Sequence, residues 1–199
     1  MLTRADTSRG PDGVVLAGGA GRRLGGPKAA VRLGDLTLVE RAVAALASRC
    51  RRVVVVTRPG IPLPALAVPV VEDMPGPPCA LRALATGLGA VDAEEVLVLA
   101  CDLPLAGPVL DALRTAPGGT AVAGASGGEP QPLCARYPRD DALAAAERLL
   151  ASGALAARGL LDALGARVVE AEGPALLNVN APADLARARA ILAGGSAAS

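Results

Sequence analysis

The chain has 199 residues, which is long enough for one sizeable core and short for two domains. Hydrophobic residues make up 52% of the chain and aromatic residues only 1%, so the core must be built from Ala, Val and Leu. The 20 Lys and Arg residues nearly balance the 19 Asp and Glu residues, which argues against a nucleic-acid or membrane partner, and the absence of histidine excludes every mechanism that needs an imidazole.

The first segment, residues 1–12, is polar, and we expect it to be flexible. It lacks the apolar stretch of a secretory signal. No run in the chain approaches the ~18 apolar residues that a membrane helix needs. We therefore predict a cytoplasmic protein.

A short apolar run at residues 13–17 predicts a buried strand that opens into a glycine-rich loop at residues 18–28. The loop also carries Arg22, Arg23 and Lys28. Glycines let main-chain amides approach an oxyanion, Arg can grip two oxygens, and Lys supplies a mobile charge. The loop therefore predicts a phosphate site, and a glycine-rich surface turn is the alternative interpretation.

This loop matches neither of the two best-known phosphate loops. The Walker pattern needs Ser or Thr after the lysine, but Ala29 follows Lys28. The dinucleotide pattern needs a third glycine where Leu24 stands.

Apolar strands alternate with amphipathic helices along the rest of the chain, which predicts a doubly wound α/β fold with a mostly parallel sheet and helices on both faces. The predicted strands lie at residues 52–57, 68–71 and 95–100, near 121 and 133, and at 168–169. The predicted helices lie at residues 37–48, 79–90, 108–114, 140–151 and 154–164, with a last helix after Pro182 whose apolar stripe is Leu185, Ala188 and Leu192. We expect a single domain at residues 13–193 and a flexible tail at 194–199.

The chain contains four cysteines that stand far apart, without the CxxC spacing of a zinc or redox site. We therefore predict buried free thiols. The four are Cys50, Cys79, Cys101 and Cys134.

Several polar residues follow predicted strands, and ligands of such sheets bind at the carboxyl ends of strands. Asp102 comes after one strand and could bind Mg²⁺ through one oxygen or cap the next turn. Asp73 follows another strand, in a proline-rich stretch that also suits an ordinary turn. Asn180 precedes the last helix, where it could be a helix cap or, in the company of Asp102, a ligand.

Residues 16–28, with the sequence LAGGAGRRLGGPK, resemble the signature loop of the molybdenum cofactor guanylyltransferases, a MobA-like nucleotidyltransferase family. The resemblance covers about residues 13–192 and implies a nucleotide-diphospho-sugar transferase-like, Rossmann-type fold. It continues, in the family's order and approximate spacing, through Glu72-Asp73, Cys101-Asp102-Leu103-Pro104, Gln131-Pro132-Leu133-Cys134-Ala135 and Asn178-Val179-Asn180-Ala181-Pro182.

The resemblance implies roles for individual residues. The first residues of the loop would contact the guanine or the ribose, Lys28 the triphosphate, and Asp73 the nucleotide. Asp102 would bind Mg²⁺, and Asn180 would lie beside the metal or the acceptor. The implied nucleotide-binding set is Leu16, Ala17, Gly18, Gly19, Gly21, Lys28, Asp73, Asp102 and Asn180, and the implied catalytic set is Arg22, Lys28 and Asp102.

The implied reaction transfers GMP from GTP to the terminal phosphate of molybdopterin and releases pyrophosphate. No general base is required, because a phosphate monoester with a second pKa of about 6 is mostly ionised at pH 7. The implied partners are GTP, the molybdopterin cofactor and molybdoenzyme maturation proteins. Gly18 favours GTP, because the related cytidylyltransferases usually carry Ala there.

The chain departs from the family pattern mainly on the acceptor side. Pro27 replaces an acidic residue, residues 76–80 differ from the usual Gly-Pro-Leu-Ala-Gly run, and Gln131 stands where His is common. Two alternatives therefore stay open. The chain could use another nucleotide or acceptor, such as CTP with molybdopterin or a nucleotide with a sugar phosphate or a phospholactate, or it could be a non-catalytic nucleotide-binding module.

Overall fold

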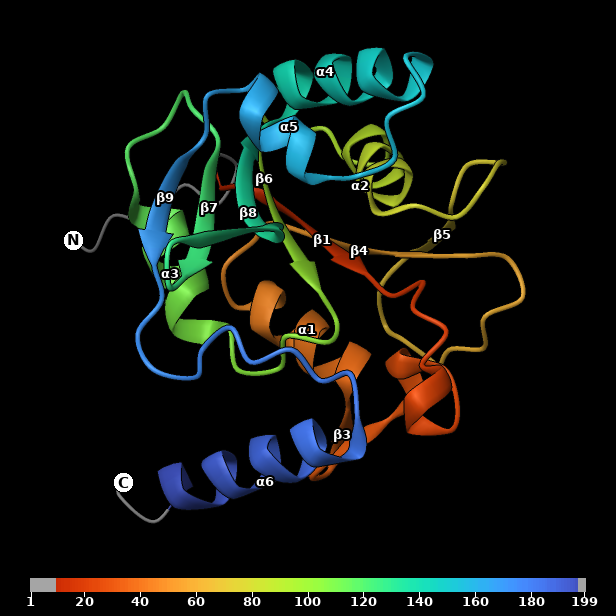
Figure 1. The fold of residues 1–199 in the computed structure, drawn as a ribbon, viewed down its shortest axis with the longest axis vertical. Helices are drawn as coiled ribbons and strands as arrows, with labels where there is room; N and C mark the ends of the chain where they lie inside the picture. The colour runs from red at the N-terminus through yellow and green to blue at the C-terminus, as the bar shows by residue number, and fades with distance from the viewer. Residues whose placement is uncertain (1–9, 197–199) are drawn as a thin grey trace, which may run out of the picture.

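The computed structural model describes residues 10–196 of the chain, in which seven strands form one sheet (Figure 1). The strand order is β5-β4-β1-β6-β8-β7-β9. All neighbours are parallel except that β8 runs antiparallel to β6 and to β7. The strands are β1 (Asp12–Leu16), β4 (Val53–Thr57), β5 (Val70–Glu72), β6 (Glu95–Ala100), β7 (Val122–Ser126), β8 (Glu129–Pro138) and β9 (Arg167–Glu170).

Helices cover both faces of this sheet, because the side chains of each central strand alternate between two buried layers. Val15 and Val55 face α1 and α3, whereas Val14 and Val56 face α2, α4 and α5. The first face carries α1 (Leu38–Ala47) and α3 (Gly107–Thr115), and the second carries α2 (Ala80–Gly89), α4 (Arg139–Ala151) and α5 (Arg158–Ala163). The predicted doubly wound, mostly parallel sheet is therefore confirmed.

The start of α1 follows from two polar side chains. Thr37 Oγ1 accepts a hydrogen bond from the Glu40 amide at 3.3 Å, and the Thr37 amide donates to Glu40 Oε2 at 2.7 Å. These bonds satisfy main-chain amides that the first turn of a helix leaves free. The predicted capping box is present and fixes where the helix begins.

The last helix, α6 (Pro182–Ser196), packs away from the sheet against a short hairpin of β2 (Arg32–Leu33) and β3 (Leu36–Thr37), which the sequence did not predict (Figure 1). Their shared cluster buries Leu33, Leu38, Val179 and Ala188. The predicted stripe of α6 is confirmed, since Ala188 is buried and its other two residues pack against the same cluster. This cluster ties the segment before α6 to the segment that follows the glycine loop.

Some element boundaries differ from those expected. The strand expected at 68–71 forms at 70–72, and the helix expected from 154 begins at Arg158. Asp12 is a buried residue of β1, so the strand begins inside the segment expected to be flexible, and α6 continues to Ser196, into the expected tail. Residues 1–9 and 197–199 lie outside the described part of the chain. Within residues 10–196, no helix is long and apolar enough to cross a membrane.

Candidate functional site

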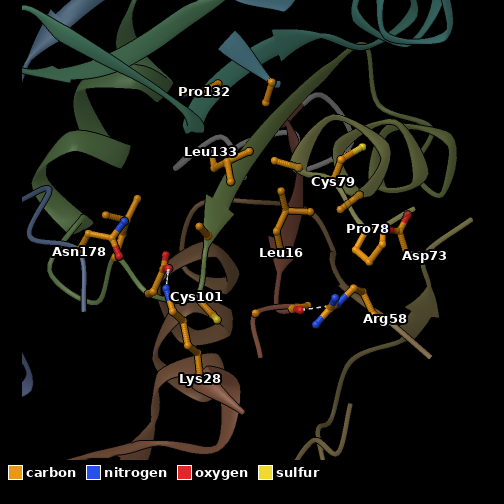
Figure 2. Close-up of a pocket in the computed structure, with 18 of the residues that line it drawn as sticks. Leu16, Lys28, Arg58, Asp73, Pro78, Cys79, Cys101, Pro132, Leu133 and Asn178 are labelled. Carbon is orange, nitrogen blue, oxygen red and sulfur yellow. Dashed lines mark hydrogen bonds and ion pairs between the residues drawn. The ribbon is translucent and has the colours of Figure 1, made fainter. Parts of the chain in front are cut away.

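A cavity of about 570 Å³ opens at the carboxyl edge of the central strands (Figure 2). Its walls come from the loop after β1, the segment after β6, the start of α2 and the middle of β8. Its volume falls in the range of small-molecule sites, which is about 300–1,000 Å³. The topology thus places a ligand-sized cavity where parallel sheets generally bind ligands.

Three polar side chains from distant parts of the sequence meet at one end of this site. The Lys28 ammonium donates to Asp102 Oδ2 at 2.6 Å and also to the side-chain oxygen of Asn180. The side chains of Lys28 and Asp102 are 17% and 16% exposed, so the pair is shielded but reachable. Lys28 is the only lysine in the chain. The structure therefore brings these three predicted site residues together.

The segment before α6 holds Asn180 in place. The Val179 amide donates to the Asp102 carbonyl at 2.8 Å, and the Val179 side chain is buried in the α6 cluster. Asp184, in the first turn of α6, accepts through Oδ2 from the amides of Asn180 and Ala181 at 2.9 and 2.8 Å. The side-chain oxygen of Asn180 accepts from Lys28 and, among the described residues, from no helix amide, so the helix-cap interpretation of Asn180 is wrong.

The glycine loop is tight enough to direct Lys28 into this cluster. Gly21 has a φ of 58°, and a Cβ there would stand 1.9 Å from the Gly26 carbonyl oxygen, so no side chain fits. The Lys28 amide donates to the Gly19 carbonyl at 3.2 Å. A Cβ at Gly19 would lie 3.1 Å from the Lys28 Cδ, which shows that the lysine stem passes close over this glycine.

The two arginines of the loop are placed differently. Arg22 and Arg23 belong to the one-turn helix η2 (Arg22–Leu24), and both are exposed. Neither lines the cavity. The structure does not bring Arg22 together with Lys28 and Asp102, and its catalytic role stays a prediction.

The other predicted residues divide between cavity and core. Leu16, Gly18, Gly19 and Asp73 line the cavity. Asp73 follows β5 and is buried, and its Oδ1 accepts from the hydroxyl of Thr86 in α2 at 2.7 Å. Ala17 does not line the cavity, because its side chain is buried in the core on the α1 face.

Among the cavity residues to which the sequence analysis gave no role, three are Arg58, Cys79 and Asn178. Arg58, directly after β4, donates from Nε to the Gly18 carbonyl at 2.7 Å. Cys79 is the residue before α2, and Asn178 is exposed on the side opposite Cys79 (Figure 2). Arg58 could have been found, because it follows a predicted parallel strand just as Asp102 does.

The donor atoms in this site fit a magnesium ion held mainly by its substrate. Among residues 10–196, no three His, Cys, Asp or Glu side chains form a metal-binding group. Asp102 Oδ1 accepts no hydrogen bond from these residues, whereas Oδ2 holds Lys28. Magnesium is commonly bound through one or two carboxylates together with substrate phosphates. Asp102 Oδ1, a carboxylate oxygen without a partner among the described residues, lies beside the glycine loop and matches that pattern.

Comparison with known families and proteins shows which family the chain resembles. The family model of the MobA-like NTP transferase domain matches residues 13–170. A protein of Mycobacterium avium named probable molybdenum cofactor guanylyltransferase is 37% identical over 190 residues, which is 89% of this chain and 96% of that protein. A Mycobacterium tuberculosis protein with the same name is 39% identical over 186 residues, 87% of this chain and 90% of its own length.

Solved structures share the fold. Molybdopterin-guanine dinucleotide biosynthesis protein A of Archaeoglobus fulgidus superposes with a TM-score of 0.73 at 23% identity, covering 92% of this chain and 99% of that one. The 2-C-methyl-D-erythritol 4-phosphate cytidylyltransferase of Thermus thermophilus superposes with a TM-score of 0.70 at 24% identity. The match covers 91% of this chain and 98% of that one. The same architecture therefore occurs in proteins named for different nucleotides and acceptors.

Proposed function

The chain belongs to the MobA-like NTP transferase family and is a nucleotidyltransferase, and from this premise we propose that it transfers GMP from GTP to the terminal phosphate of the molybdenum–molybdopterin cofactor. The relatives named for this activity, at 37% and 39% identity over most of the chain, support the proposal. The observation that carries it is the meeting of Lys28, Asp102 and Asn180 beside the glycine loop at the cavity.

Lys28 is suited to hold the phosphates of the nucleotide. An ammonium group has three N–H donors. Two of them point to Asp102 and Asn180, which leaves one for a phosphate oxygen. The loop can add main-chain amides, and hydrogen bonds from the Lys28 amide to the Gly19 carbonyl and from the Gly26 amide to the Gly21 carbonyl hold its main chain in place.

Asp102 would hold the magnesium ion, with Asn180 as a neighbouring oxygen donor. Bound there, Mg²⁺ would neutralise the charge that develops on the phosphates.

The reaction would form a bond between an oxygen of the acceptor phosphate and the α-phosphorus of GTP, and would break the bond to pyrophosphate. The acceptor phosphate is already ionised near pH 7, so the residues have no proton to remove. Their work is to hold the two substrates in line and to neutralise charge. This requirement fits a chain without histidine.

One experiment tests the reaction. The protein is incubated with Mg²⁺, molybdopterin and GTP, CTP or ATP in turn, and the dinucleotide product and pyrophosphate are identified by mass spectrometry. We expect the guanine dinucleotide to be the main product. A cytosine dinucleotide as the main product, or no transfer to molybdopterin from any nucleotide, would contradict the proposal.

A second candidate is the same transfer with another nucleotide or acceptor. The departures at Pro27, residues 76–80 and Gln131 favour it, and so does the shared fold with a cytidylyltransferase. Pyrophosphate release on a sugar phosphate or a phospholactate, without release on molybdopterin, would identify it. A cytoplasmic location and contact with molybdoenzyme maturation proteins stay predictions.

A further inference from the structure

Two cationic side chains reach the cavity from opposite sides of β1. This strand lies between β4 and β6 in the sheet, Arg58 follows β4, and Lys28 binds Asp102 directly after β6. Figure 2 shows Lys28 and Arg58 on either side of Leu16. The site thus has one cation on the β6 side and a separate one on the β4 side.

One hydrogen bond holds the Arg58 side chain in place, and its other N–H donors have no partner among the described residues. Its Nε donates to the Gly18 carbonyl at 2.7 Å, and the side chain is partly buried in the cavity wall. Among residues 10–196, its two terminal nitrogens make no hydrogen bond and no carboxylate pairs with them. A guanidinium group has five N–H donors, and only the one on Nε is used here. The remaining donors are available to a ligand.

Gly18 makes room for this arrangement. A Cβ at position 18 would stand 3.0 Å from Arg58 Cγ and 3.6 Å from its Cδ. A contact of 3.0 Å is tighter than nine in ten that real Cβ atoms make, so an alanine would push the arginine stem away by a few tenths of an ångström. The position of Arg58 therefore depends on glycine at position 18.

We propose that Arg58 is a specificity residue that reads the base of the nucleotide, an inference that rests on the proposed transfer of a nucleotide at this site. In the proposed function Lys28, which binds Asp102 on the β6 side, holds the phosphates. Arg58 lies on the β4 side, where Asp73 and Pro78 also line the cavity. Its flat group of parallel donors suits guanine, which presents two acceptors, O6 and N7, on one edge. Cytosine presents an amino donor on the corresponding edge, which a guanidinium cannot bind.

The test measures binding of GTP, CTP and inorganic tripolyphosphate by calorimetry, without acceptor, for the wild type and Arg58→Gln. We expect the preference for GTP over CTP to fall about tenfold or more, as for the loss of a bidentate contact to guanine, and tripolyphosphate binding to stay unchanged. Arg148→Gln is the control, because it removes an exposed arginine of α4 outside the cavity. An unchanged preference in Arg58→Gln overturns the inference. An equal loss of affinity for GTP, CTP and tripolyphosphate also overturns it, because Arg58 would then bind phosphate.

A double-mutant cycle tests the link to Gly18. We expect Gly18→Ala to lower the preference for GTP in the wild type and to have little further effect in the Arg58→Gln background. Fully additive effects would overturn the claim that Gly18 acts through Arg58. Failure of the proposed reaction looks different: the wild type would still bind GTP in preference to CTP but would form no guanine dinucleotide with molybdopterin.

Discussion

The two ends of the central sheet each hold a carboxylate beside basic groups, but the two arrangements differ in what they leave free. At the amino end, Asp12 is fully buried and accepts from Arg51 and from the amides of Asp92 and Ala93. At the carboxyl end, Asp102 is 16% exposed and has one oxygen without a partner among the described residues. An ion pair alone therefore does not identify a functional site in this fold.

The hydrogen bonds of Asp12 change the pKa of its carboxyl group. Burial alone would raise the pKa of this carboxyl group. The hydrogen bonds from Arg51 and from the two amides outweigh burial and hold the pKa of Asp12 below its ordinary value. Asp12 is thus held in the ionised state and stabilises the fold. Because it is buried and already bonded to Arg51 and two amides, it is not available to a ligand. The comparison predicts that substitutions at the carboxyl end change the reaction and those at the amino end change stability.

The largest effect is expected for Asp102→Asn. This change keeps the shape of the side chain and removes the charge that would bind magnesium, so we expect the rate of nucleotide transfer to fall by about 10³-fold. The melting temperature should shift by only about 2 °C, since no core packing is lost. Pyrophosphate release and thermal unfolding are the measurements, and Asp35→Asn, an exposed carboxylate of the hairpin turn, is the control. Normal turnover in Asp102→Asn would remove Asp102 from the mechanism.

Lys28→Gln should lower the transfer rate by about 10²-fold, because a positioned charge on the phosphates is lost. The same change should strengthen the binding of Mn²⁺ alone, which can be followed by electron paramagnetic resonance, because a cation 2.6 Å from Asp102 disfavours a second one. Lys28→Arg keeps the charge and is the matched control, with metal affinity close to that of the wild type. If Lys28→Gln binds Mn²⁺ no better than Lys28→Arg, the charge of Lys28 does not compete with a metal ion for Asp102.

Asp12→Asn should instead lower the free energy of unfolding by about 2 kcal/mol at pH 7, because Arg51 loses a buried partner while remaining partly exposed itself. A lowered pKa in the folded state means that the stabilisation is complete above the unfolded value of about 3.9 and is lost as the pH falls through the folded pKa. The variant should therefore show a flatter loss of stability in acid than the wild type in urea titrations. Its transfer rate per folded molecule should be unchanged, and a rate loss without a stability loss would break the comparison.

Much of the fold could be predicted because local patterns determine it. Continuous Val and Leu runs specify buried strands, and the Thr37–Glu40 capping box marks the start of α1. Asp12 could not be assigned to a strand, because its partner Arg51 lies 39 positions away and a polar residue suggests a loop. The β2–β3 hairpin was missed because each strand has only two residues and its apolar surface is covered by α6, about 150 positions later.

The meeting of Lys28 with Asp102 could be expected from the sequence, because Asp102 follows a predicted strand and the family resemblance names both residues. The contact between Lys28 and Asn180 depends on the packing of α6, because the two residues lie 152 positions apart in the sequence. Arg58 carries no motif, and although its place after a predicted strand is a signal, only the strand order, which puts β4 next to β1, shows that it lies beside the glycine loop. Arg22 shows the converse, because its place in the loop sequence did not bring it to the cavity.

The smallest expected effect uses a natural thiol to ask whether the carboxyl end is open to ligands. Cys79 lines the cavity and is partly exposed, whereas burial raises the pKa of Cys50, Cys101 and Cys134 to about 12. A thiol with so high a pKa holds almost no reactive thiolate at pH 8. An alkylating reagent should therefore modify Cys79 selectively, as peptide mass mapping can show.

A bound nucleotide should slow that alkylation. At a GTP concentration ten times its Kd, about one site in eleven is free, so the rate should fall about tenfold. Cys79→Ser should abolish labelling, which checks that the signal comes from this thiol alone. If GTP binds by calorimetry but leaves the labelling rate unchanged, the nucleotide does not fill the part of the cavity beside α2, and the ligand site must be confined to the Lys28 side of β1.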